Sequence, residues 1–221
     1  MGKNSIMCMC IFILGCIFLI SEDKVQARNM DYYGLSKYKS NTPEFDKTSF
    51  ITLRSSYRYL SVSQVQSISN IYIHKKHNYG FYGYSTIIHR YENKSINGDS
   101  VVMDHATGLM WHQSGSDKYM EWKKAKDWVS DLNNMGYAGY YDWRLPTVEE
   151  AASLLESSKK AGDLYIDTVF DIRQIYIWTG DKNDTARYLD VAWAVLFNIG
   201  GVNWNDLAIS HRYVRPVRLL K

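Results

Sequence analysis

The chain has 221 residues and a formal net charge of +3. Basic and acidic residues are interleaved along it, so the charge pattern gives no support to nucleic-acid binding. Its three cysteines, Cys8, Cys10 and Cys16, all lie near the N-terminus. The rest of the chain therefore has no disulfide, no thiolate nucleophile and no cysteine-bound metal, and its core alone must stabilise it.

Residues 6–20 form an uncharged apolar run that is short for a membrane span and typical of a signal peptide. Small residues near Ala27 suit cleavage there, so we expect 1–27 to be a signal peptide and the protein to be secreted, periplasmic or at the cell surface. Two alternatives stay open, a lipoprotein with its lipid on Cys16 and an uncleaved leader. We expect membrane attachment only through one of these.

Residues 28–52 are polar and lack periodicity, which predicts a flexible linker. Residues 53–95 then form an N-terminal extension of the folded domain. Within it, Ser61 and Gln64 predict a capped helix running to about Ile68.

The same extension contains signals for strands and loops. Residues 71–73 alternate like a strand, residues 80–84 read as a loop because of their glycines, and residues 86–89 read as a strand. His74 and His77 flank two lysines without an acidic neighbour, so a solvated loop is the better interpretation than a metal site.

A β-hairpin is predicted next. Residues 100–103 read as a strand, Asp104 to Gly108 as its turn, and residues 109–111 as the returning strand. His105 and His112 flank this hairpin, and we expect both at the surface or in turns.

Two helices follow the hairpin. Apolar residues from Trp122 to Leu132 recur at helical spacing, and Gly136 is a suitable stop. Thr147 and Glu150 predict a capping box at the start of the second helix. We expect Arg144 to pair with Asp142 or Asp190 and to stack on Trp143. The residues expected to have structural roles are Trp111, Trp143, Arg144, Thr147 and Glu150.

Short aromatic strands fill the remainder, at 176–179, 192–197, 202–204 and 213–219, with a tight turn at Gly200–Gly201. Arg215 and Arg218 are expected on opposite faces of the last strand, in structural roles. A hairpin, two helices and a strand meander predict an α+β fold, with two helices packed on a short-stranded, mainly antiparallel sheet.

Six segments in this order resemble the Lcl C-terminal domain family, namely VVMDHATGLMW, WKKAKDWVSDLN, GYAGYYDWRLPTVEEAASLLE, YIWTGD, AWAVLFNIGG and YVRPVR. The resemblance covers about 96–219, and we expect an Lcl C-terminal-like domain at 96–221. It implies a C-type-lectin-like fold, similar to that of formylglycine-generating enzymes, and binding at bacterial cell surfaces or in the periplasm. One characterised type of member adheres to sulfated polysaccharides. Formylglycine generation needs a cysteine pair and copper, so it cannot carry over to a chain without cysteines after Cys16.

We therefore expect an exported, non-catalytic module that binds a polysaccharide or a surface protein through its C-terminal strands and loops, without nucleic acid and without a cofactor. The 18 tyrosines and seven tryptophans suit a recognition surface, although a β-rich fold alone also favours aromatics. In the C-type-lectin fold the late strands build the ligand face. The residues predicted there are Trp193, Asn198, Asn203, Trp204, Asn205, Asp206, Ser210 and His211.

Other functions remain as alternatives. Trp204-Asn205-Asp206 matches the triplet of calcium-dependent lectins, so calcium binding at Asn205 and Asp206 stays open, although the usual partner loop is missing. Ser210, His211 and Asp206 resemble a triad in composition only, because no motif positions them. A structural envelope module without a ligand, or a degenerate enzyme related to the formylglycine-generating group, would also fit.

Overall fold

The computed structural model describes residues 50–184, 190–207 and 209–220. The expected signal peptide at 1–27, the candidate lipid site at Cys16 and the predicted linker up to residue 49 lie outside the described residues. No helix in the described ranges is long and apolar enough to cross a membrane.

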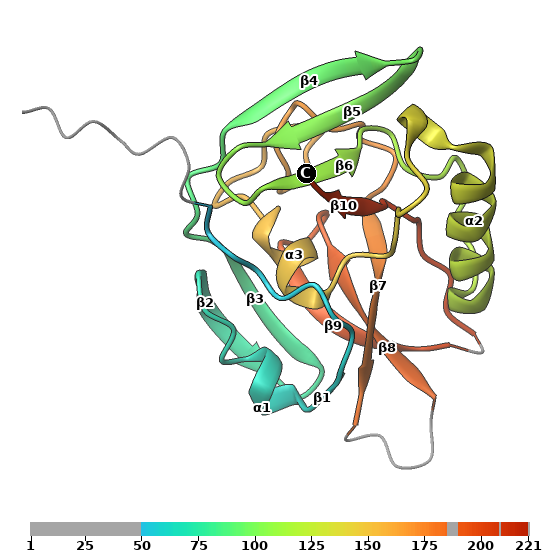
Figure 1. The fold of residues 1–221 in the computed structure, drawn as a ribbon. Helices are drawn as coiled ribbons and strands as arrows, with labels where there is room; N and C mark the ends of the chain where they lie inside the picture. The colour runs from blue at the N-terminus through green and yellow to red at the C-terminus, as the bar shows by residue number, and fades with distance from the viewer. Residues whose placement is uncertain (1–49, 185–189, 208, 221) are drawn as a thin grey trace, which may run out of the picture. The chain divides into compact units, whose positions relative to one another are not determined.

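The strands form two sheets (Figure 1). The larger sheet has six strands, in the order β1 (Tyr59–Leu60), β7 (Tyr176–Asn183), β8 (Val191–Leu196), β9 (Gly201–Asp206), β3 (Gly80–Ser85) and β2 (Ile71–His77). All neighbours in it are antiparallel except β1 and β7, which run parallel. The second sheet is antiparallel, in the order β10 (Val217–Leu219), β6 (Leu109–His112), β5 (Asp99–Asp104) and β4 (Tyr91–Ile96).

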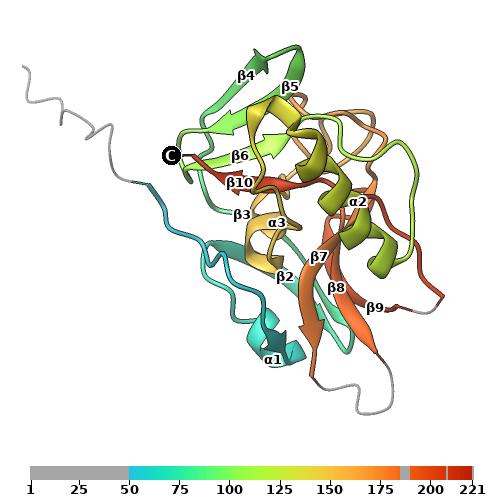
Figure 2. The ribbon, with the colours of Figure 1, turned by 45° about the vertical axis from the view of Figure 1, so that its right-hand side comes forward.

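The helices are short and few among the described residues. They are α1 (Val62–Val65), α2 (Trp122–Met135), a 3-10 turn (Tyr137–Gly139) and α3 (Val148–Ser153). Figure 2 shows α2 and α3 against the strands from a second direction. The predicted α+β class is confirmed, with strands predominating and divided between two sheets.

The local signals for helix ends are confirmed. Ser61 with Gln64 and Thr147 with Glu150 both form complete capping boxes. Gly136 ends α2 in the left-handed conformation, with φ of 68°. The first helix ends at Val65, earlier than expected.

Three predictions about residues 71–89 are wrong. Residues 80–84 form strand β3 rather than a loop, while residues 86–89 form no strand. The glycines serve close strand contacts instead of a turn, because a Cβ on Gly80 would lie 1.9 Å from the Val202 carbonyl oxygen and one on Gly83 would lie 2.4 Å from that of Tyr72. His74 and His77 belong to β2, so the predicted solvated loop is also a strand.

The six-stranded sheet separates two clusters of buried side chains. Helix α3 packs on β3, β7 and β8 from one side, and the cluster there includes Phe81, Trp193 and Phe197. The cluster on the other side includes Trp178 and residues of α2. We call these the α3 face and the α2 face of the sheet, and Figure 1 shows α2 beside the β7 end, away from β2.

Helix α3 begins in a buried ionic cluster that corrects the expected partner of Arg144. The Arg144 guanidinium donates to both oxygens of Glu150, at 2.7 and 2.6 Å. Asp142 pairs with Arg218 instead, at 2.7 Å, and Asp190 pairs with Lys182, at 2.6 Å. Arg144 pairs with Glu150 and not with Asp142 or Asp190 because the capping box directs the Glu150 carboxylate back toward the segment before α3, where Arg144 lies.

Asp181 of β7 is the second carboxylate of this cluster, and it is fully buried. It accepts hydrogen bonds from the Arg54 guanidinium at 2.9 and 2.8 Å, from the Arg58 N–H at 2.6 Å and from the Val148 N–H at 2.7 Å. One side chain therefore joins the N-terminal segment, the start of α3 and β7.

Both C-terminal arginines are buried, which fits the structural roles expected for them, although only Arg218 lies within β10. Arg218 pairs with Asp142. Arg215 precedes the strand, so the expectation of opposite strand faces does not apply to it. Its guanidinium donates to the carbonyl oxygens of His112 and Asp171 and to the Gln174 side chain.

His112 is buried in the interior, contrary to its expected place at the surface or in a turn. Its Nδ1 accepts a hydrogen bond from the Gly115 N–H at 2.8 Å, and its ring stacks on Tyr137 with centroids 4.2 Å apart. Burial, together with the nearby charge of Arg215, lowers the pKa of His112 to about 3.

Replacing Asp181 with alanine should destabilise the fold by about 3 kcal/mol or more, because it breaks the pair with the half-buried Arg54 and removes the acceptor of the Arg58 and Val148 N–H groups. Urea unfolding measures the change. Lys182→Met is the neighbouring control, and its exposed pair with Asp190 should contribute less than about 1 kcal/mol. Equal losses from the two variants would contradict the importance of the Asp181 cluster.

His112 should make the protein less stable in acid. Its folded-state pKa of about 3 lies below the unfolded value of about 6.5, so its stabilising contribution is present above pH 6.5 and is lost as the pH falls. The expected slope is about 1.4 kcal/mol per pH unit between the two values. The difference in unfolding free energy between the protein and a His112→Asn variant should shrink as the pH falls from 7 to 4, and a constant difference would refute the assignment.

Candidate functional site

The α2 face of the six-stranded sheet is uncovered on strands β2, β3 and β9, and we call this part the outer face. Its residues follow from the alternation of side chains and the strand register, since Phe81 and Val202 point to the α3 side. The residues of the outer face are Tyr72, Lys75, His77, Tyr82, Tyr84, Asn203 and Asn205. None of the described strand positions on this face holds a carboxylate.

Tyr82 is the centre of the outer face. Its ring contacts His77, with centroids 4.9 Å apart, and stacks with His74 at 6.4 Å. The Lys75 ammonium lies 5.8 Å from the same ring centroid. Beneath the ring is Gly201, where a Cβ would lie 2.9 Å from Tyr82 Cδ1, so a glycine at this position lets the ring lie flat on the sheet.

A second aromatic pair extends the surface along the strands. Tyr72 and Tyr84 face each other across β2 and β3, with ring centroids 5.1 Å apart. Tyr72 is 53% exposed. The outer face therefore presents a row of tyrosines rather than a single ring.

His77 is held as a neutral imidazole with a defined tautomer. Its Nδ1 accepts a hydrogen bond from the Tyr79 N–H at 3.3 Å, so Nε2 carries the proton. Burial lowers the pKa of His77, and the charge of Lys75 lowers it further. The Nε2–H donor of this neutral ring is itself buried and has no hydrogen-bond partner among the described residues.

Arg212 lies across the edge of the outer face. Its guanidinium is 4.8 Å from the Tyr176 ring centroid and donates to Asn205 Oδ1. Ala194 lies between Trp178 and Asn203 in the register, and its small side chain leaves room for the arginine to cross β8.

The outer face also holds polar atoms without a hydrogen-bond partner. Six buried side-chain nitrogens or oxygens in the described ranges have none, and three of them, His77 Nε2, Asn203 Oδ1 and Arg212 Nε, belong to this surface. His77 and Asn203 flank Gly80 in the register. Buried polar groups normally have partners, so these three atoms are an unusual concentration of unsatisfied groups just beneath the outer face.

The predicted C-terminal face is not one surface. Trp193 is fully buried, and its indole N–H donates to the Leu60 carbonyl oxygen, so it belongs to the core and is removed from the candidate site. It was misplaced because alternation along β8 does not reveal that both faces of that strand are covered. Asn203 and Asn205 lie on the outer face, while Trp204 lies on the α3 side against Tyr79, with centroids 5.1 Å apart.

The other predicted residues lie apart from these. Asn198 is exposed in the β8–β9 turn, and a strand of six residues, about 20 Å long, separates that turn from the far end of β9. At that far end, His211 lies against Tyr119 and its Nε2 is 3.9 Å from the Glu121 carboxylate. Ser210 donates its backbone N–H to the Asp206 carbonyl oxygen.

The positions of Asn205 and Asp206 do not favour a shared calcium site. Asn205 and Asp206 point to opposite faces of β9, and Asn205 Oδ1 already accepts from the Arg212 guanidinium, whose charge opposes a second cation. Across the residues that the structure describes, no group of three or more His, Cys, Asp or Glu side chains gathers as a metal site.

Sequence reasoning missed the contribution of β2 and β3 to the candidate site. The glycines at 80 and 83 made this segment read as a turn, although Tyr82 and Tyr84 recur at the spacing of a strand face. That alternation was the signal that could have revealed the tyrosine row.

Replacing Lys75 with glutamine should raise the pKa of His77 while leaving it below 6.5, because burial is the larger cause of its lowering. Titration of the imidazole C–H signals by NMR measures the change. Lys76→Gln is the matched control, since Lys76 pairs with Phe81 and points to the other side of the sheet. The described arrangement fails if Lys76→Gln raises the pKa as much as Lys75→Gln does.

Comparison with known proteins gives one match. Residues 100–218 match the Lcl C-terminal domain, from β5 to β10. No curated protein matches the chain. No solved structure matches it either. Because the match spans more than half of the chain and includes the hairpin, both longer helices and the late strands, the protein belongs to the Lcl C-terminal domain family.

Proposed function

We propose that this protein is a non-catalytic binding module that recognises a polysaccharide through its outer face. The observation that carries the proposal is the tyrosine row centred on Tyr82, with histidines, a lysine and asparagines around it. A pyranose ring has an apolar C–H side that packs on an aromatic ring and a rim of hydroxyls that needs hydrogen-bond partners. Tyrosine supplies both an apolar ring and a polar tip.

The shape and charge of the surface favour a long glycan. Successive side chains on β2, β3 and β9 present an extended sheet surface, which suits a polymer better than an isolated small molecule. Lys75 and Arg212 are positive and the described strand positions of the outer face carry no carboxylate, so acidic polysaccharides are the preferred class. Family membership supports the same direction, since one characterised type of member adheres to sulfated polysaccharides.

We also propose that the protein is exported. An exported protein, secreted, periplasmic or attached to the cell envelope, would meet such glycans directly. We propose a C-type-lectin-like fold for the domain, a proposal that its α+β composition and family membership support. Binding is proposed to need neither calcium nor another cofactor, because the outer face offers amides, hydroxyls and cations rather than clustered carboxylates.

Tyr82→Ala should weaken binding of the full chain to immobilised acidic polysaccharides by about tenfold or more, the effect of losing a central aromatic contact. Retention on coated beads, with and without a calcium chelator, measures it. Tyr141→Ala is the matched control, since Tyr141 is an exposed tyrosine (72%) outside the outer face.

The same measurement separates the competing sites and functions. Loss of binding with Trp204→Ala but not with Tyr82→Ala would place the site around Trp204, one of the residues predicted from the sequence, on the α3 side of β9. Absence of binding across broad glycan and surface-protein screens would favour a structural envelope module. Turnover of a substrate that depends on His211 would favour a degenerate enzyme.

A further inference from the structure

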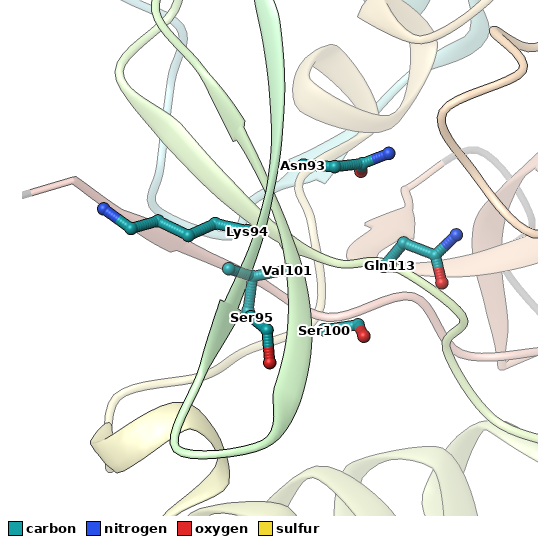
Figure 3. Close-up of a pocket in the computed structure, with 6 residues that line it drawn as sticks. All are labelled: Asn93, Lys94, Ser95, Ser100, Val101 and Gln113. Atoms are coloured by element: carbon teal, nitrogen blue, oxygen red, sulfur yellow. The ribbon is translucent and has the colours of Figure 1, made fainter.

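A polar hollow lies at the open end of the four-stranded sheet, within the β4–β5 hairpin and beside the chain that leaves β6 (Figure 3). Its volume is about 310 Å³, and its lining residues are Asn93, Lys94, Ser95, Ser100, Val101 and Gln113. This volume is at the lower end of the range of about 300–1,000 Å³ that is usual for small-molecule sites.

The polar groups of the hollow come from one face of the hairpin. Ser95 and Ser100 are register partners, and Asn93 is two residues before Ser95 on the same strand face. In Figure 3, Asn93, Ser100 and Gln113 lie on one side of the hairpin, while the Lys94 side chain extends from the other side. The hollow is therefore lined by amides and hydroxyls, and the ammonium points away from it.

One wall of the hollow is rigidly positioned. The Gln113 N–H donates to the Ser100 carbonyl oxygen at 3.2 Å, and its side-chain amide donates to the Val169 carbonyl oxygen at 3.1 Å. The backbone carbonyl oxygen of Gln113 accepts a hydrogen bond from the fully buried Arg215. Because the Gln113 side chain is already held in place, binding a ligand at this wall would cost little conformational entropy.

The opposite wall presents polar side chains that are exposed to solvent. In the described parts of the chain, no hydrogen bond engages the side chains of Asn93, Ser95 or Ser100, although Ser100 gives its carbonyl oxygen to Gln113 and to the Tyr137 hydroxyl. Together the three side chains offer an amide with two N–H groups and two hydroxyls, which both donate and accept.

From this arrangement we infer that the hollow is a second saccharide site, which takes a single neutral hexose unit. Hydroxyls of a sugar alternate as donors and acceptors, as the amides and serines do, and neither a carboxylate nor the Lys94 ammonium faces the ligand to select for charge. An extended peptide is a poorer occupant, since strand addition needs side-chain pockets for specificity, and the exposed β4 edge offers mainly polar positions.

This site lies on a different sheet from the outer face, so its existence does not depend on the polysaccharide proposal. The test uses the full chain and a panel of methyl glucosides, galactosides and mannosides. At least one of them should shift the NMR signals of Asn93, Ser95 and Ser100 and the side-chain amide of Gln113, with saturation at millimolar concentrations.

Asn93→Ala should weaken that binding by about tenfold, by removal of an amide that makes more than one hydrogen bond. Asn134→Ala is the matched control and should leave binding unchanged, since Asn134 is an exposed asparagine of α2 that does not line the hollow. Asn93 is itself exposed on an edge strand, so neither substitution threatens the fold. Tyr82→Ala should also leave the hexoside shifts unchanged, which separates this site from the outer face. The inference is overturned if no hexoside shifts these signals, or if Asn134→Ala and Asn93→Ala weaken binding equally.

Discussion

Two buried carboxylates at the start of α3 determine how the domain is joined together. Asp181 and Glu150 are fully buried, and a buried carboxylate is tolerated only when it is paired and hydrogen-bonded. Arg54 and Arg144 supply the charges, and the N–H groups of Thr147 and Val148 supply further donors. Because Arg54 lies in the segment just before β1, this requirement fastens the N-terminal part of the described chain to α3 and β7. The parallel pairing of β1 with β7 follows directly.

This arrangement decides which surfaces remain free. With α3 and its cluster on one side of the six-stranded sheet, and the α2 cluster over β7 and β8 on the other, the α2 face stays open on β9, β3 and β2. The same strands can then carry tyrosines outward without loss of core, since Phe81 and Val202 supply the apolar side chains on the inner side. The outer face is thus a consequence of packing elsewhere. Gly201 contributes to it because the absence of a Cβ leaves space for the Tyr82 ring.

Features that depend on neighbouring residues were predictable from the sequence, and features that depend on distant partners were not. The capping boxes, the Gly136 stop and the hairpin after residue 100 follow local rules, and all are present. The partner of Arg144 was missed, because the choice among nearby acids is made by the path of α3 and not by spacing alone. Trp193 was placed on the surface because covering of both faces of β8 is a tertiary property. The two glycines of β3 gave a wrong loop prediction for a similar reason. Gly80 must be small because Val202 of β9, distant in sequence, lies against it, and Gly83 must be small because Tyr72 of the paired strand β2 lies against it.

The positions of the two proposed sites limit what family membership can say about ligands. The match to the Lcl C-terminal domain begins at residue 100, whereas β2, β3 and β4 all precede it. Tyr82, Lys75 and His77 of the outer face, and Asn93 and Ser95 of the hollow, therefore come from strands outside the matched region. The matched part supplies Asn203, Asn205 and Arg212 to one site, and Ser100 and Gln113 to the other. Since strands from both parts are needed to complete each surface, members with a different upstream segment would share the scaffold without sharing the ligand.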